Sequence, residues 1–221
     1  MDGSGQANGP RPAVAETAPL YATAYGLQMR PFALASDSGA IYWSDAHRRA
    51  ASVLEYGLMS AAPVTLLTGE IGTGKTVLVQ SFLARLRSGA LGAGYRAVPV
   101  EPGPGGRRAI LAAVLAALGR PLPALADDEI GDLTLSLELQ RAVLAERAAG
   151  RRLVIVVDEA QSLSDAALEA LRQLTNIAAE PATVQLTLIG QPELAARLRR
   201  SELRALAQRV VARGELGPMS A

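Results

Sequence analysis

Short apolar runs alternate with segments of helical period along most of this chain. Five runs are predicted as strands, at residues 64–67, 95–100, 153–157, 183–189 and 210–216. Apolar residues at helical spacing between them predict helices over residues 77–86, 107–118 and 134–148. Strands that alternate with helices favour an α/β fold of three layers, in which helices cover both faces of a mostly parallel five-stranded sheet. The last strand is expected at an edge of this sheet.

Several helix positions carry more specific signals. Ser44 is expected to cap a helix before the first strand, and Pro192 to occupy the first turn of another helix. Ser162 and Asp165 are expected to form a capping box after the strand at 153–157. The helix over 134–148 is expected to bury one face, consisting of Leu135, Leu139, Val143 and Leu144.

The same pattern divides the chain into three parts. Residues 1–22 are rich in Gly, Pro and Ala and lack periodicity, so they are predicted to be a disordered leader. Residues 23–62 are predicted to form an N-terminal segment that packs on an α/β core at 63–218. The aromatic residues expected to pack this segment are Phe32, Tyr42 and Trp43. No apolar run is long enough for a membrane span or a signal peptide, so a soluble, cytoplasmic protein is expected.

Composition narrows the range of functions. A net charge of +1 gives no polycationic surface, which weakens the argument for non-specific binding to nucleic acid. The absence of cysteine excludes disulfides and thiolate metal sites. His47 is the only histidine and has no cluster of metal ligands around it in the sequence, so a capping or packing role is expected.

A glycine-rich loop between the first strand and the next helix is the strongest chemical signal. It reads GEIGTGKT and consists of Gly69, Glu70, Ile71, Gly72, Thr73, Gly74, Lys75 and Thr76. This pattern is typical of a P-loop, whose backbone N–H groups surround the phosphates of ATP. Lys75 is expected to reach the β- and γ-phosphates and Thr76 to ligate Mg²⁺. Of 22 Lys and Arg residues, Lys75 is the only lysine.

Two carboxylates follow the apolar strand at 153–157. In an open α/β sheet, ligands bind beside the carboxyl ends of strands. Asp158 is therefore expected to hold Mg²⁺, and Glu159 to act as the general base toward the attacking water. The alternative is a helix N-terminus with favourable charge. The P-loop upstream favours the catalytic interpretation.

These motifs and their surroundings resemble the ExeA/GspA group of AAA+ ATPases, which is associated with general secretion and type IV pilus systems. The similarity runs from Tyr25 to Met219 and rests on YGLQMRPFAL, YWSDAHRRA, TGEIGTGKT, VVDEAQSLSDAALEALRQLTN, LIGQPELAARL and LRALAQRV. The resemblance implies an ATPase that drives assembly of an envelope machine such as a secretin. Family members commonly continue into a helical lid, a membrane span and a peptidoglycan-binding region. The lid is expected to be missing from this chain, which ends at Ala221.

The resemblance also implies roles for two further residues. In AAA+ proteins a polar residue at the position of Gln191 helps to place the lytic water. Arg209 is the candidate arginine finger toward the γ-phosphate of a neighbouring subunit, with Arg204 and Arg213 as fallbacks. Because such a finger comes from a neighbour, a ring or another homo-oligomer is expected. Solvated surface charge is the alternative for Arg209.

Two other functions remain open at this point. One is a DNA-associated regulator of transposition, similar to TnsC and TniB proteins, which share much of this motif set. The near-neutral charge counts against it. The other is a nucleotide switch that does not hydrolyse ATP. The intact residues Lys75, Thr76, Asp158 and Glu159 count against that switch, and the missing lid counts for it.

Overall fold

A parallel sheet organises the part of the chain that the computed structural model describes, residues 43–103, 105–122, 128–177 and 182–217. The strands are β1 (Val64–Gly69), β2 (Tyr95–Val100), β3 (Arg152–Val157), β4 (Val184–Gly190) and β5 (Val210–Leu216). They lie in the order β2-β3-β4-β1-β5, and every pairing between them is parallel. All five therefore end at the same edge, which we call the carboxyl edge. The prediction of five strands is confirmed, and β5 is an outermost strand of the sheet, as expected.

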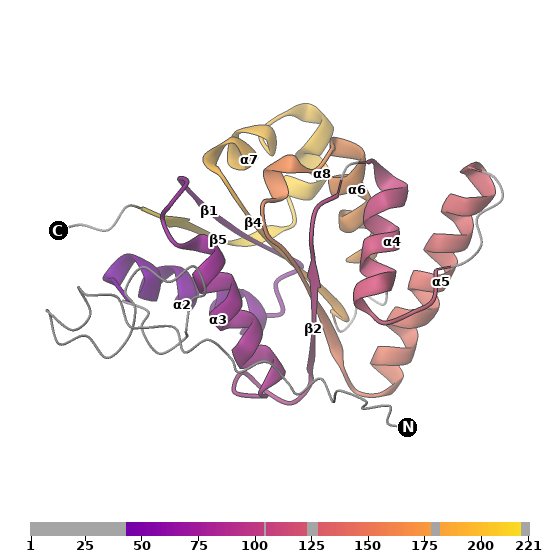
Figure 1. Ribbon diagram of the computed structural model, residues 1–221, viewed down its shortest axis with the longest axis horizontal. Helices are drawn as coiled ribbons and strands as arrows, with labels where there is room; N and C mark the ends of the chain where they lie inside the picture. Colours follow the sequence, from indigo (N-terminus) through magenta and orange to yellow (C-terminus); the bar gives the residue numbers. More distant parts are fainter. Residues whose placement is uncertain (1–42, 104, 123–127, 178–181, 218–221) are drawn as a thin grey trace, which may run out of the picture. The chain divides into compact units, whose positions relative to one another are not determined.

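Helices cover both faces of the sheet. They are α2 (Asp45–Met59), α3 (Lys75–Arg87), α4 (Arg107–Ala117), α5 (Asp128–Ala148), α6 (Asp165–Leu174), α7 (Pro192–Arg197) and α8 (Arg204–Ala207). Two short 3₁₀ turns are η2 (Ala160–Ser162) and η3 (Ser201–Leu203). Figure 1 shows α2 and α3 on one side of the sheet, and α4, α5 and α6 on the other. The expected three-layer fold is confirmed.

The residues of β3 explain why its sequence is apolar without interruption. Val154 and Val156 pack into a core with α2 and α3. Leu153, Ile155 and Val157 point into a second core with α4, α5 and α6. A strand covered on both faces has no polar side, so alternation disappears. This buried strand holds the two carboxylates that follow it at a fixed place on the carboxyl edge.

One predicted buried position on α5 is wrong. Leu135, Leu139 and Val143 are buried as expected, but Leu144 is 46% exposed. Steps of four residues keep the first three on one stripe of the helix, whereas Leu144 lies about 100° further round from Val143.

The predicted capping box at the start of α6 is also wrong. Ser164, not Ser162, caps the helix, because its Oγ accepts a hydrogen bond from the N–H of Ala167 at 3.2 Å. Ser162 lies in η2, and its hydroxyl donates to the carbonyl of Glu159 at 2.8 Å. The 3₁₀ turn delays the helix to Asp165.

The helix expected over residues 134–148 begins earlier, at Asp128. Two other predicted helix starts are confirmed. Ser44 caps α2 by accepting from the N–H of His47 at 3.3 Å, and Pro192 opens α7. Phe32 and Tyr42 lie outside the described residues, as does the predicted leader. Within the described ranges, no helix is long and apolar enough to cross a membrane.

Candidate functional site

The loop between β1 and α3 takes a shape that depends on two glycines. Gly72 and Gly74 have φ angles of 80° and 88°, in the left-handed region that favours glycine. A Cβ on Gly74 would also lie 2.6 Å from Nε2 of His47. His47 is buried, and its Nδ1 lies 2.7 Å from Oγ of Ser44. The side chain of His47 therefore packs against the loop from the start of α2.

The side chain of Lys75, the first residue of α3, points back into the glycine-rich loop. Its side chain is buried, and Nζ donates to the carbonyl oxygens of Gly69 and Glu70, both at 2.8 Å. The N-cap residue of α3, Gly74, has no side chain to bind the first N–H groups of the helix. A buried ammonium beside a helix N-terminus without a side-chain cap is suited to phosphate oxygens.

Thr76 and Asp158 bring two oxygen ligands together from different elements. The hydroxyl of Thr76, in the first turn of α3, donates to Oδ2 of Asp158 at 3.1 Å. Among the described residues, no group of three or more His, Cys, Asp or Glu side chains converges on one point. Mg²⁺ needs no such cage, because it is usually held by one or two carboxylates together with phosphate oxygens and water. The pair Thr76 and Asp158 therefore fits Mg²⁺ bound with a nucleotide.

Glu159 turns the chain sharply after β3. Its φ of 53° places it in the left-handed region, which is uncommon for a residue other than glycine. Its N–H donates to Oδ1 of Asp158 at 2.9 Å. The strained turn leaves the side chain of Glu159 exposed at the carboxyl edge, beside the pair that would hold the metal.

Gln161 connects Glu159 with the end of β4. Its Nε2 donates to Oε2 of Glu159 at 2.5 Å, and its Oε1 accepts from the N–H of Gln191 at 3.1 Å. Gln191 thus lies at the carboxyl edge near Glu159, and its contact with Gln161 runs through its backbone N–H. The sequence DEAQ contained Gln161, but its position within the motif did not reveal this bridge.

A sequence profile for the AAA domain matches residues 58–198, which is more than half of the chain and includes the loop and both carboxylates. The chain belongs to the AAA domain family. It is also 39% identical over 203 residues to the general secretion pathway protein A of Aeromonas hydrophila. That alignment covers 91% of this chain and 35% of the relative, so the chain spans about a third of the relative's length. The expected resemblance to the ExeA/GspA group is confirmed.

Solved structures support the same fold. The AAA domain is similar to Cdc6p from Pyrobaculum aerophilum, with a TM-score of 0.61 and 18% identity over 82% of this chain and 48% of that one. It is also similar to the ORC2 protein from Aeropyrum pernix in its ADPNP–ADP complexes, with a TM-score of 0.59 and 17% identity over 77% of this chain and 46% of that one. At these identities the likeness concerns the fold alone.

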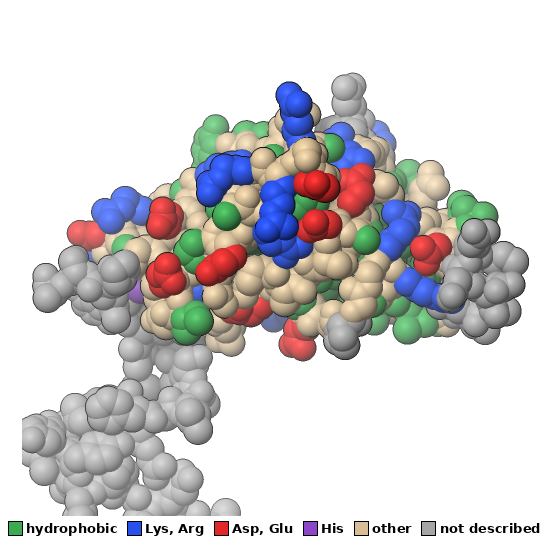
Figure 2. All heavy atoms as spheres, turned by 90° about the horizontal axis from the view of Figure 1, so that it is seen from above, with side chains coloured by type: hydrophobic (Ala, Val, Ile, Leu, Met, Phe, Trp, Pro, Cys, Tyr) green, Lys and Arg blue, Asp and Glu red, His purple; other side chains and the backbone are tan. Residues whose placement is uncertain are grey.

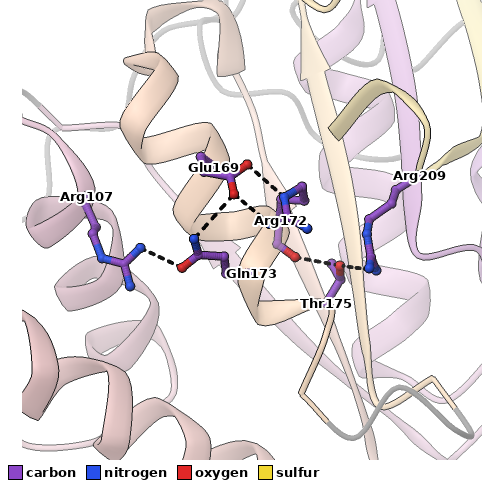
Figure 3. Close-up of polar contacts among 6 residues, drawn as sticks. All are labelled: Arg107, Glu169, Arg172, Gln173, Thr175 and Arg209. Carbon is purple, nitrogen blue, oxygen red and sulfur yellow. Dashed lines mark hydrogen bonds and ion pairs between the residues drawn. The ribbon is translucent and has the colours of Figure 1, made fainter. Parts of the chain in front are cut away.

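Arg209 lies where the parallel strands begin, at the opposite end of the sheet from the glycine-rich loop of this AAA domain. The next residue, Val210, pairs with Val64 at the start of β1, whereas Gly69 at the end of β1 pairs with Leu216. The guanidinium of Arg209 donates to Oγ1 of Thr175 at 3.1 Å (Figure 3). Arg209 therefore does not belong to the phosphate site of its own chain.

The contact of Arg209 is the end of a polar network along α6 (Figure 3). Thr175 also donates to the carbonyl of Arg172 at 2.7 Å, and Arg172 holds Glu169 through two hydrogen bonds of 2.8 and 2.6 Å. These bonds lower the pKa of the Glu169 carboxyl. Because the folded-state pKa is lowered, the pair stabilises the fold above the ordinary pKa of a glutamate and loses this effect as the pH falls through the folded-state value.

At its other end the network reaches α4. Gln173 donates to Oε1 of Glu169 at 3.3 Å and accepts from Arg107 at 2.7 Å. Sequence patterns do not reveal this network, because residues that bond directly to each other in it are separated by up to 66 positions.

Proposed function

We propose that this chain binds ATP with Mg²⁺ and hydrolyses it, and that hydrolysis drives assembly of a secretion- or pilus-type system of the cell envelope. The observation that carries the first part is the meeting of Lys75, Thr76, Asp158 and Glu159 at one edge of the sheet. The second part is supported by the 39% identity to the general secretion pathway protein A. We further propose a cytoplasmic location, with attachment to the inner membrane through partners.

Each residue of the site has a distinct task in this proposal. Lys75 donates to the β- and γ-phosphates in place of its present carbonyl partners. Thr76 and Asp158 hold Mg²⁺, which neutralises phosphate charge when it is bound. Glu159 takes a proton from water as the water oxygen bonds to the γ-phosphorus and the bond to the β-phosphate oxygen breaks. Gln191 helps to place that water from the end of β4.

We also propose that the protein acts as a homo-oligomer. Arg209 lies at the opposite edge of the sheet from its own loop. It can therefore act on a γ-phosphate only when the surface around Arg209 faces the glycine-rich loop of a second copy of the chain. The hydrogen bond to Thr175 fixes its guanidinium in the single chain.

The envelope role is tested in a strain that lacks the gene. The full protein should restore the detergent-resistant secretin multimer seen on immunoblots, whereas the Lys75→Ala protein should leave it at the level of the deletion strain. Arg87→Lys, at an exposed position on the same helix, is the matched control and should restore assembly. Normal secretin assembly in the deletion strain would contradict the proposed role.

A second candidate function is regulation of a DNA transaction, and one surface favours it. Four arginines line a hollow of about 680 Å³ beside α8 together with Ser201 and Gln208. They are Arg199, Arg200, Arg204 and Arg213. Within the described residues, none of these guanidinium groups has an ion pair or hydrogen bond, and no acidic residue lines the hollow. Figure 2 looks onto the end of the molecule where α7 and α8 lie, and shows basic side chains at its centre beside acidic ones.

Unpaired arginines around one hollow favour a polyanion such as a DNA backbone. The ORC1 protein of Aeropyrum pernix, solved in complex with DNA, shares this fold with a TM-score of 0.57 and 23% identity. The candidate predicts that exchanging Arg199 and Arg200 together for glutamate weakens duplex binding more than about ten-fold at low salt, measured by fluorescence anisotropy. The matched control is a variant in which Arg49 and Arg87, which are exposed on α2 and α3, are both exchanged for glutamate. A protein with no affinity for DNA at low salt would exclude this candidate.

A further inference from the structure

We infer that Gln161 is a positioning residue, which fixes the carboxylate of Glu159 relative to the end of β4. The inference deepens the proposed hydrolysis and rests on it. Gln161 bonds both partners at once, Oε2 of Glu159 at 2.5 Å and the N–H of Gln191 at 3.1 Å. Glu159 and Gln191 belong to different loops at the carboxyl edge, and this one amide group joins them.

The surroundings hold Gln161 in place. Its carbonyl accepts from Nη1 of Arg197 at 2.7 Å, and the same guanidinium pairs with Asp165 at the start of α6. Its side-chain oxygen fits because residue 190 is glycine: a Cβ there would lie 2.6 Å from Oε1 of Gln161. Gln161 as a whole is half-buried.

The chemistry of an amide suits both bonds. Glu159, as an acceptor, needs a donor, and the N–H of Gln191 needs an acceptor. Glutamine supplies one of each at the end of the same side chain. Glutamate would place a second carboxylate against Glu159, and methionine of similar length would offer neither bond. Since one oxygen of Glu159 is bound to Gln161, the other is free to accept from water.

The bridge also couples the position of the Glu159 carboxylate to the end of β4. A displacement of the N–H of Gln191 moves the oxygen of Gln161, and its nitrogen carries Glu159 along. A nucleotide that contacts the end of β4 therefore changes the position of Glu159 through Gln161. No movement of the rest of β3 is required for this coupling.

Turnover of Gln161→Met measures the positioning role. We expect kcat to fall about 10- to 100-fold, the effect of one hydrogen bond to a charged group, with KM for ATP within about two-fold of the native value. In a protein that already carries Glu159→Gln, the same exchange should have no further effect on the residual rate, because residues that act as a unit are not additive. Gln140→Met, at an exposed position on α5, is the matched control. An equal loss in both backgrounds, or a rise in KM without a fall in kcat, would overturn the inference.

Hydrogen exchange at the amide of Gln191 tests the bridge without any turnover. This N–H should exchange faster in Gln161→Met, and also in Glu159→Ala, because the loss of Glu159 releases the other end of the bridge. Unchanged exchange in Glu159→Ala would overturn the coupling even if the protein hydrolyses ATP. If both variants show the faster exchange but the native protein does not hydrolyse ATP, the proposed hydrolysis is contradicted and the bridge is still supported.

Discussion

Replacing Lys75 by arginine is expected to weaken ATP binding by about 100-fold or more, although arginine supplies every other long cationic side chain of this protein. Lys75 is only 5% exposed, and its ammonium donates to two carbonyl oxygens, both at 2.8 Å. A planar guanidinium is larger and has its donors in a rigid fork, so it does not fit this narrow place. Two hydrogen bonds to charged phosphates are lost, each with a contribution of about 1.5–3 kcal/mol.

Isothermal titration calorimetry with ATP and Mg²⁺ measures this loss. The reverse exchange on the same helix, Arg87→Lys, changes the cation at an exposed position and should leave the affinity as it is. An arginine at residue 75 that binds ATP as tightly as the native protein would show that the loop does not select a compact cation. The buried place of the Lys75 ammonium would then be wide enough for a guanidinium.

Glu159→Gln is expected to lower kcat by about 10²- to 10⁴-fold while ATP affinity stays within about two-fold. The exchange keeps the size of the side chain and removes only its ability to take a proton. Phosphate release in single-turnover assays separates this step from binding. Glu193→Gln is the matched control, because Glu193 is an exposed acid in the first turn of α7.

Two outcomes would contradict the base assignment in different ways. Unchanged turnover in Glu159→Gln would show that another group accepts the proton. A native protein that binds ATP and never hydrolyses it would support the nucleotide switch that the sequence left open. Tight binding in both proteins, with turnover in only one, is the expected pattern.

The elements of this fold were predictable because each signal was local. The strands at 95–100 and 210–216 have the predicted bounds, and the apolar run before Asp158 reports burial on both faces. The P-loop was equally local, since its glycines and its lysine lie within residues 69–75.

The site beyond the motifs was not predictable in the same way. Thr76 and Asp158 lie 82 residues apart, yet their motifs predicted that both hold Mg²⁺. The contact of Arg209 with Thr175, 34 residues away, belongs to no motif. The bridge of Gln161 to Gln191 crosses 30 residues and uses a backbone N–H, which carries no signature in the side-chain sequence. The cap at Ser164 was displaced by a 3₁₀ turn that apolar spacing does not reveal.

The contact between His47 and Gly74 has a consequence for where the working unit of this protein begins. The motif-bearing region starts at β1, and the family profile starts at residue 58, after most of α2. Yet the imidazole of His47 fills the space behind the loop where any larger residue 74 would need to go. A fragment that begins at the first strand would keep every residue of the phosphate motif and lose His47, which packs against the loop at Gly74. We therefore expect a fragment that begins at β1 to bind a nucleotide more weakly than one that also contains α2.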